Sequence, residues 1–279
     1  MGTPSWGLTP AAALDRADAV PQLAANDWQL WTASVQDASP ALSLLLDDTE
    51  RRRLATYRRD HDRQAFLVSA AMLRLAFATA TRRPPAQLTV LRSCSWCGGP
   101  HGRPRLALRC TDLEASVTYS GDHVLIGLSR FRSGLDIEQM REGLDVASLL
   151  CVLSCAEAVA VSGLLGSREA VRAFLTCWVR RESVLKMLGT GLAEDRPIEM
   201  TAPDLPPAVL AGPPLLEPED SYFLYDMQPA PRVVGCLAAS RPVRTVTQVN
   251  GSAVIDHWRS SLCAGPIPQT GRVYQGVRP

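Results

Sequence analysis

The pattern of apolar and polar positions predicts an early strand followed by two helices. Residues 28–35 hold aromatic, aliphatic and β-branched side chains typical of a strand. Residues 47–50 supply N-cap chemistry and first-turn acids for a helix ending near Arg59. A second helix carries apolar residues spaced four, three and four apart on one face, namely Phe66, Ala70, Leu73 and Phe77. We expect it to stop at the prolines of residues 84–85.

Short alternating segments separated by Gly, Pro, Asp or Ser come next and predict a meander of strands. They are residues 88–91, 105–108, 116–119, 124–128 and 134–138. The order of helices before strands then recurs. Ser154 and Glu157 form a capping-box pattern before residues 158–165. A longer helix is expected over 167–188, and strands over 222–227 and 233–238.

This order predicts an α+β protein with two halves of similar plan, each with helices packed on a small, mostly antiparallel sheet. We place the N-terminal half at residues 27–133 and the C-terminal half at 134–249. Residues 1–26 are rich in Ala and Pro and are expected to be a flexible arm. Residues 199–220 are expected to be a proline-rich loop. Residues 250–279 show no clear periodicity and are expected to be a tail.

Composition is that of a soluble globular protein, with 46% apolar and 20% charged residues and a net charge of +1. That balance argues against a surface built to bind nucleic acid. The longest apolar runs are interrupted by Arg, Ser or Gly, and the start of the chain lacks signal-peptide features. We therefore expect a cytoplasmic protein with no membrane partner, whose eight cysteines are reduced thiols.

Two carboxylates lie two residues apart in the segment 134–138. On a strand, Leu135 and Ile137 can enter the core while Asp136 and Glu138 project from the other face. Two acids at that spacing repel each other unless a cation lies between them, and oxygen ligands of this kind suit Mg²⁺. Taken alone, the pattern is more often an edge strand with two solvated acids.

A third acid lies on the long predicted helix. Trp178, Glu182 and Lys186 fall four residues apart and share one helix face. Glu and Lys at this spacing most often form a surface ion pair, which contributes about 0.3–0.5 kcal/mol. The functional alternative makes Glu182 a third metal ligand and Lys186 a phosphate contact or proton donor.

These segments together resemble the Sfp-type 4'-phosphopantetheinyl transferases. The likeness rests on four stretches in the family's order, covering roughly residues 28–240: Gly102–Leu106, Ser116–Gly121, Gly134–Glu138 and Trp178–Leu192. It implies the fold of that family, with coenzyme A held between two pseudo-symmetric halves. It also implies transfer of the 4'-phosphopantetheine arm of coenzyme A to a serine of an acyl or peptidyl carrier protein.

The resemblance further implies roles for individual residues. Asp136, Glu138 and Glu182 would bind Mg²⁺, Glu182 would accept the serine proton, and Lys186 would stabilise or protonate the departing phosphate. The residues expected to contact coenzyme A are Arg53, Arg59, Arg63, His101, Arg103, Arg105, Thr118, Tyr119, Asp136 and Lys186. The chain length favours the monomeric, broad-specificity type, acting on carriers of fatty acid, polyketide or nonribosomal peptide synthesis.

The chain departs from the family at Tyr119, where a histidine is usual, at Ser116, usually Asn, and at Arg181, usually Lys. A phenol can donate a hydrogen bond to phosphate but brings no positive charge. Two other functions therefore remain open. One is a different Mg²⁺-dependent phosphotransferase or hydrolase acting on a nucleotide. The other is a related protein that binds coenzyme A or a carrier without turnover.

Two further clusters have an ordinary structural interpretation beside a functional one. The arginines of residues 51–63 form either a solvated helix face or, as in the family, a site for the 3'-phosphate of coenzyme A, with Arg53 as the best match. Cys94 and Cys97 form a single CxxC pair that His101 and Cys110 could complete as a zinc site. A glycine-turned loop with two free thiols is the favoured interpretation.

Overall fold

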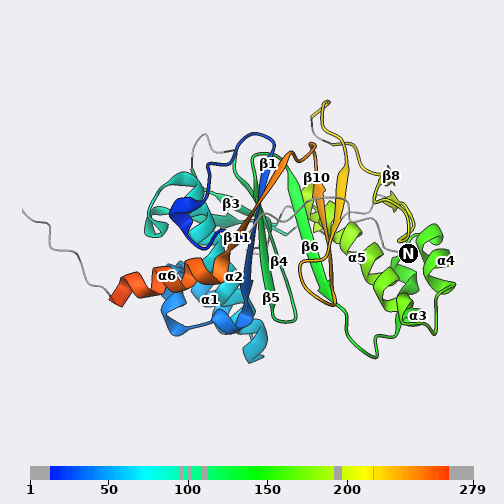
Figure 1. Cartoon of the computed structure of the whole chain (residues 1–279), viewed down its shortest axis with the longest axis horizontal. Coiled ribbons are helices and arrows are strands. Elements are labelled where there is room, and N and C mark those ends of the chain that lie inside the picture. The colour runs from blue at the N-terminus through cyan, green and yellow to red at the C-terminus, as the bar shows by residue number, and fades with distance from the viewer. Residues whose placement is uncertain are drawn as a thin grey trace, which may run out of the picture.

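Two larger sheets of the protein, with four and three strands, are packed between two long helices (Figure 1). Two further sheets in the described residues have two strands each. The computed structural model describes residues 13–94, 97–99, 102–108, 112–191, 197–215 and 217–263. The helices are α1 (Asp48–Thr56), α2 (Asp60–Thr81), α3 (Val146–Leu149), α4 (Cys155–Ser162), α5 (Glu169–Leu188) and α6 (Gly251–Cys263). The strands are β1 (Asp27–Ser34), β2 (Val90–Arg92), β3 (Pro104–Leu106), β4 (Glu114–Ser120), β5 (His123–Ser129), β6 (Ser133–Gln139), β7 (Glu199–Met200), β8 (Val209–Ala211), β9 (Phe223–Met227), β10 (Val233–Ala239) and β11 (Thr245–Asn250). The mixed, mostly antiparallel α+β class expected from the sequence is confirmed.

The first sheet has the strand order β11-β1-β5-β4. Strand β1 pairs in parallel with β11 and antiparallel with β5. Side chains alternate across this sheet, as they must on extended backbone. Trp31 of β1 and Ile126 of β5 pack with α2 in one core, whereas Trp28 and Leu125 enter a second core on the opposite face.

Helix α2 covers the outer face of the first sheet (Figure 1). By length and composition alone α2 could cross a membrane, but 72% of its most apolar window is buried inside the protein. The helix ends at Thr81, and the next residue, Arg82, adopts a left-handed conformation just before the predicted proline stop. The preceding helix, α1, begins as predicted with a capping box between Asp47 and Glu50, but it ends at Thr56, a few residues before Arg59.

The second sheet has the order β6-β10-β9 and is covered on its outer face by α5 (Figure 1). Its inner face meets the first sheet, where Leu135 and Ile137 of β6 are buried with Trp28. Gly134 allows β6 to approach α5 closely. A Cβ at this position would lie 2.0 Å from the carbonyl oxygen of Ser183 and 2.4 Å from the amide nitrogen of Met187.

Hydroxyl side chains join the two sheets along β4 and β6. Ser116 exchanges hydrogen bonds with the backbone of Leu135, at 2.8 Å from its amide nitrogen and 3.4 Å from its carbonyl oxygen. Thr118 Oγ1 accepts from the amide of Ile137, and Ser120 Oγ accepts from that of Gln139. We call these three residues of β4 the hydroxyl seam. Their alternate spacing puts all three hydroxyls on the face toward β6.

Both ends of the described chain pack more closely than the sequence predicts. Residues 250–279 were expected to be a tail, but α6 forms there and buries Val254 and Ile255 beside α2 and β1. In the expected flexible arm, residues 13–26, the described part, bury Val20 and Leu23, and Leu14 bridges to Val249. The expected division at residue 134 assigns β11 to the second half, yet β11 completes the first sheet. The proline-rich segment 199–220 contains the short pair β7 and β8.

Candidate functional site

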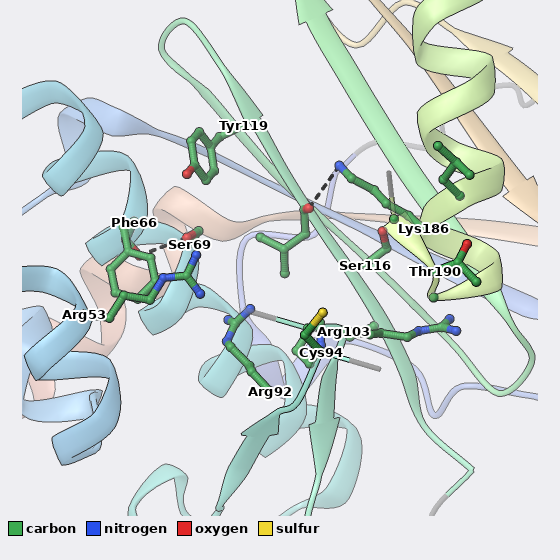
Figure 2. Close-up of a pocket in the computed structure, with 17 residues that line it drawn as sticks. Arg53, Phe66, Ser69, Arg92, Cys94, Arg103, Ser116, Tyr119, Lys186 and Thr190 are labelled. Atoms are coloured by element: carbon green, nitrogen blue, oxygen red, sulfur yellow. Dashed lines mark hydrogen bonds between the residues drawn. The ribbon is translucent and has the colours of Figure 1, made fainter. Parts of the chain in front are cut away.

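A cavity of about 540 Å³ opens between α2, the β2–β3 loop, β4 and the C-terminal end of α5 (Figure 2). Its walls are basic on several sides. The residues that line it are Arg53, Phe66, Ser69, Arg92, Cys94, Gly102, Arg103, Pro104, Ala115, Ser116, Val117, Tyr119, Leu185, Lys186, Gly189, Thr190 and Gly191. Cationic walls around a cavity of this size suit an organic anion.

Asp136 and Glu138 leave β6 on the side that faces α5, as the alternation of the strand predicts. Asp136 is buried, and its Oδ1 accepts a hydrogen bond from Thr118 Oγ1 at 3.0 Å. Glu138 accepts one from Ser120 Oγ at 2.7 Å. Burial raises the pKa of Glu138, and the neighbouring charge of Asp136 raises it further.

Glu182 lies on the face of α5 that turns toward these two acids. Burial raises its pKa first, followed by the charges of Asp136 and Glu138, while Lys186 acts in the opposite direction. Its Oε1 is buried and has no hydrogen-bond partner within the described part of the chain. Glu182 is therefore close enough to both strand acids for their charges to raise its pKa.

Lys186 connects the acids to the cavity. Its Nζ lies 2.6 Å from Asp136 Oδ1 and donates to the carbonyl oxygen of Leu135 at 3.1 Å. It also donates to the carbonyl oxygen of Val117 at 3.4 Å (Figure 2). Lys186 is also the only lysine in the sequence, since the other 28 basic residues are arginines. A compact ammonium with three donors matches three acceptors at this corner, whereas a planar guanidinium does not.

The three carboxylates fit a hard divalent cation by chemistry. They are oxygen ligands, two of them have raised pKa values, and one buried oxygen lacks a partner, so a cation beside them would offset their repulsion. Within the described residues, however, no three His, Cys, Asp or Glu side chains converge as a ready ligand set. Asp136, Glu138 and Glu182 would have to turn toward a shared ion.

The structure separates the expected basic contacts into two groups. Arg53 lines the cavity with its guanidinium 5.1 Å from the centre of the Phe66 ring. Arg59, Arg63 and Arg105 are exposed and do not line it, and Arg63 instead pairs with Asp60. His101 lies outside the described residues.

Arg103 lines the cavity, but its guanidinium is held by structural contacts. It lies 3.1 Å from Glu114 and donates to the carbonyl oxygens of Met187 and Ser133. Burial lowers the pKa of Arg103 to about 10. These bonds fasten the C-terminal end of α5 to the first residue of β6. Arg103 therefore positions this wall of the cavity as well as adding charge to it.

Arg92 is a cavity residue that the sequence analysis missed. Its side chain is 13% exposed, and the nearest acid oxygen is Glu50 Oε1, 4.0 Å from Nε. Glu50 is already bound by the buried Arg74 through two hydrogen bonds. Burial lowers the pKa of Arg92, and the charges of Arg53 and Arg74 lower it further despite Glu50. Around Arg92 the guanidinium groups therefore outnumber the carboxylates, and such an excess of positive charge favours the binding of an anion.

Tyr119 and Thr118 differ in their exposure to the cavity. The Tyr119 side chain lines it, and burial together with Tyr57 raises the pKa of the phenol to about 12, so it stays a neutral donor at physiological pH. Thr118 is buried in the hydroxyl seam and reaches Asp136 instead. Arg181, which stands where the family usually has Lys, pairs at 3.0 Å with the fully buried Glu157.

Comparison of the chain with models of known protein families finds no match, and comparison with curated proteins finds none either. The function is therefore inferred from the chemistry of the cavity and of the acids beside it.

Proposed function

We propose that the protein is a Mg²⁺-dependent 4'-phosphopantetheinyl transferase that acts on coenzyme A and an apo carrier protein. The observation that carries this proposal is the contact between Lys186 and Asp136, which joins a basic cavity to three interacting acids. A phosphate-bearing substrate in the cavity would reach the acids through Lys186. The four sequence segments that resemble the Sfp-type transferases supply the residues of this junction.

The proposal includes the fold of that family, with two pseudo-symmetric halves. It is supported by the similar plan of the two sheets, since α2 covers one and α5 covers the other. The strand β11 and the helix α6 would then be additions to the first half.

The cavity would bind the adenosine bisphosphate part of coenzyme A. Arg53 and Arg92 lie on one side of the cavity and Lys186 on another (Figure 2). We assign the two arginines to the 3'-phosphate and Lys186 to the pyrophosphate. Phosphate groups bind arginine with two parallel hydrogen bonds, which orients the substrate as well as attracting it.

In the proposed reaction, the carrier serine oxygen attacks the phosphorus that bears pantetheine. An oxygen–phosphorus bond forms there as the bond to adenosine 3',5'-bisphosphate breaks. Glu182 accepts the serine proton as the general base. Lys186 donates a hydrogen bond to the departing phosphate. Asp136, Glu138 and Glu182 would hold Mg²⁺, which supplies charge neutralisation at the phosphate oxygens when bound.

The direct test is to mix the protein with coenzyme A and apo carriers of the fatty acid, polyketide and nonribosomal peptide types, and to weigh each carrier. We expect a gain equal to one phosphopantetheine arm with Mg²⁺ and none with a chelator. Binding of coenzyme A without any gain across the panel would instead favour the binding-only function. Release of phosphate from a nucleotide would favour another phosphotransferase or hydrolase.

The residue-level test is Glu182→Gln. The amide keeps the size of the side chain but cannot accept the serine proton or hold a cation strongly, so we expect carrier loading to fall by about 100-fold or more. Loading is measured by mass spectrometry at saturating coenzyme A. The matched control is Glu169→Gln in the exposed first turn of the same helix, which should load normally. Normal loading by Glu182→Gln would remove Glu182 from the mechanism.

A further inference from the structure

An ammonium group already compensates the most buried of the three acids. Lys186 Nζ lies 2.6 Å from Asp136 Oδ1, and Thr118 Oγ1 donates to the same oxygen at 3.0 Å. Asp136 is buried, so a divalent cation bound to it would lie beside the ammonium in a partly desolvated place. Two positive charges repel more strongly there than in water. Lys186 and a divalent cation therefore compete for Asp136.

The charge of Lys186 reaches all three acids and not Asp136 alone. Burial raises the pKa of Glu138 and that of Glu182, and the charge of Lys186 opposes the rise in both. In the part of the chain that the structure describes, the three carboxylates do not point at a common centre that would hold a metal ion. The cation that these acids share in this structure is therefore the ammonium of Lys186.

Lys186 is also placed to exchange Asp136 for a ligand in the cavity. Its side chain lines the cavity and is 30% exposed, so an anion that enters can reach the ammonium (Figure 2). Its other two acceptors are the uncharged carbonyl oxygens of Leu135 and Val117. Lysine carries its donors on a flexible stem. A phosphate group in the cavity can therefore draw Nζ away from the carboxylate.

We propose that the ammonium of Lys186 occupies the cation position of the three acids, so that a divalent ion binds tightly there only together with a phosphate-bearing ligand. The ligand takes the ammonium, and the divalent ion replaces it beside Asp136. By thermodynamic linkage, the ion and the ligand then tighten each other's binding by the same factor. The identity of the ligand as coenzyme A rests on the proposed function, whereas the exchange of cations does not.

The first test measures the affinity of the full-length chain for Mn²⁺ alone, from the electron paramagnetic resonance signal of the free ion. Lys186→Met removes the ammonium and keeps the length of the side chain, so we expect it to bind Mn²⁺ about 10-fold more tightly than wild type. Circular dichroism checks that the variant is folded. The matched control is Arg141→Met, which removes an exposed cation whose charge acts on Glu138. Its affinity for Mn²⁺ should change by less than about 3-fold, because solvent screens exposed charges. Equal affinity of Lys186→Met and wild type would overturn the proposal.

The second test needs no substitution, because Lys186 is the only lysine in the sequence. Lysine labelled with ¹³C at Cε therefore gives a single side-chain signal in the NMR spectrum of the wild-type protein. We expect Mg²⁺ alone to leave this signal in place, and coenzyme A with Mg²⁺ to shift it. A signal that stays unchanged while Mg²⁺ alone saturates the protein would overturn the proposal, since ammonium and metal would then share the acids. Both tests omit the carrier protein, so the exchange of cations and the proposed transfer reaction can fail separately.

Discussion

The charge of Lys186 does not by itself explain why a lysine occupies this position, whereas the shape and donors of its ammonium group do. Arginine fills every other basic position in the chain, so charge alone would have allowed an arginine here. The ammonium lies among one carboxylate and two carbonyl oxygens. Its partner Asp136 is 8% exposed, so the pair is partly desolvated and each group depends on the other. A substrate phosphate would compete with Asp136 for the same ammonium.

We therefore expect Lys186→Arg to lose function while keeping charge. The guanidinium still compensates Asp136, so the free energy of unfolding should change by only about 1 kcal/mol. Its planar donors cannot reach all three acceptors and the substrate, so kcat/KM for coenzyme A should fall by about 100-fold. The reverse exchange, Arg168→Lys at the exposed start of α5, is the control and should leave both quantities unchanged. Full activity in Lys186→Arg would show that only the charge matters.

The contact between β6 and α5 depends on Gly134. This glycine brings the helix backbone against the strand, and that approach sets where Glu182 and Lys186 meet Asp136. A methyl group there would meet backbone atoms, which cannot move aside as a flexible side chain can. The glycine in the segment 134–138 is therefore part of the site, although it has no side chain.

Gly134→Ala should destabilise the protein and displace the helix acids from the strand acids. Overpacking of this kind costs about 1–3 kcal/mol, and backbone neighbours put it at the upper end. Urea unfolding measures the loss, and carrier loading should fall in the fraction that stays folded. Gly163→Ala is the control, because a Cβ there meets nothing nearer than 3.7 Å. Equal stability of the two variants would contradict the close approach of β6 to α5.

Elements with a strong local pattern were predicted well. The apolar face of α2, the N-cap of α1, the capping box of α4 and the alternation in β6 all follow from local sequence patterns. The alternation also predicted which side of β6 the acids take. These features depend on neighbours in the sequence, which is why the sequence can reveal them.

Features that depend on distant partners were missed. Strand β11 has one buried residue, Val249, and gains its place from pairing with β1 at the other end of the chain. Helix α6 is buried only where it meets α2 and β1. Arg92 has no motif around it and becomes a cavity residue through the buried Glu50 and Arg74. Arg103 was placed among substrate contacts, but its main partners, Ser133 and Met187, come from distant elements.

The two sheets behave as one structural unit because they share a core. Trp28 and Leu125 from the first sheet pack with Leu135 and Ile137 from the second. The hydroxyl seam adds polar bonds at the edge of this core, where Thr118 Oγ1 contacts both Asp136 Oδ1 and the amide of Ile137. The hydroxyl seam thus fixes the position of the acids of β6 relative to the residues of β4 that line the cavity.

Thr118→Val should weaken the joint between the sheets without dividing the protein. The substitution keeps the volume but leaves buried partners unbonded, so we expect a loss of about 1–3 kcal/mol in the free energy of unfolding. Because the apolar core remains, urea unfolding should stay one transition by both tryptophan fluorescence and far-ultraviolet circular dichroism. Thr176→Val on α5 is the control, since its hydroxyl bonds only within its own helix, and its stability should change by less than about 0.5 kcal/mol. Two separate transitions in the wild-type chain would show that the sheets unfold independently, and the seam could not then set the position of the acids.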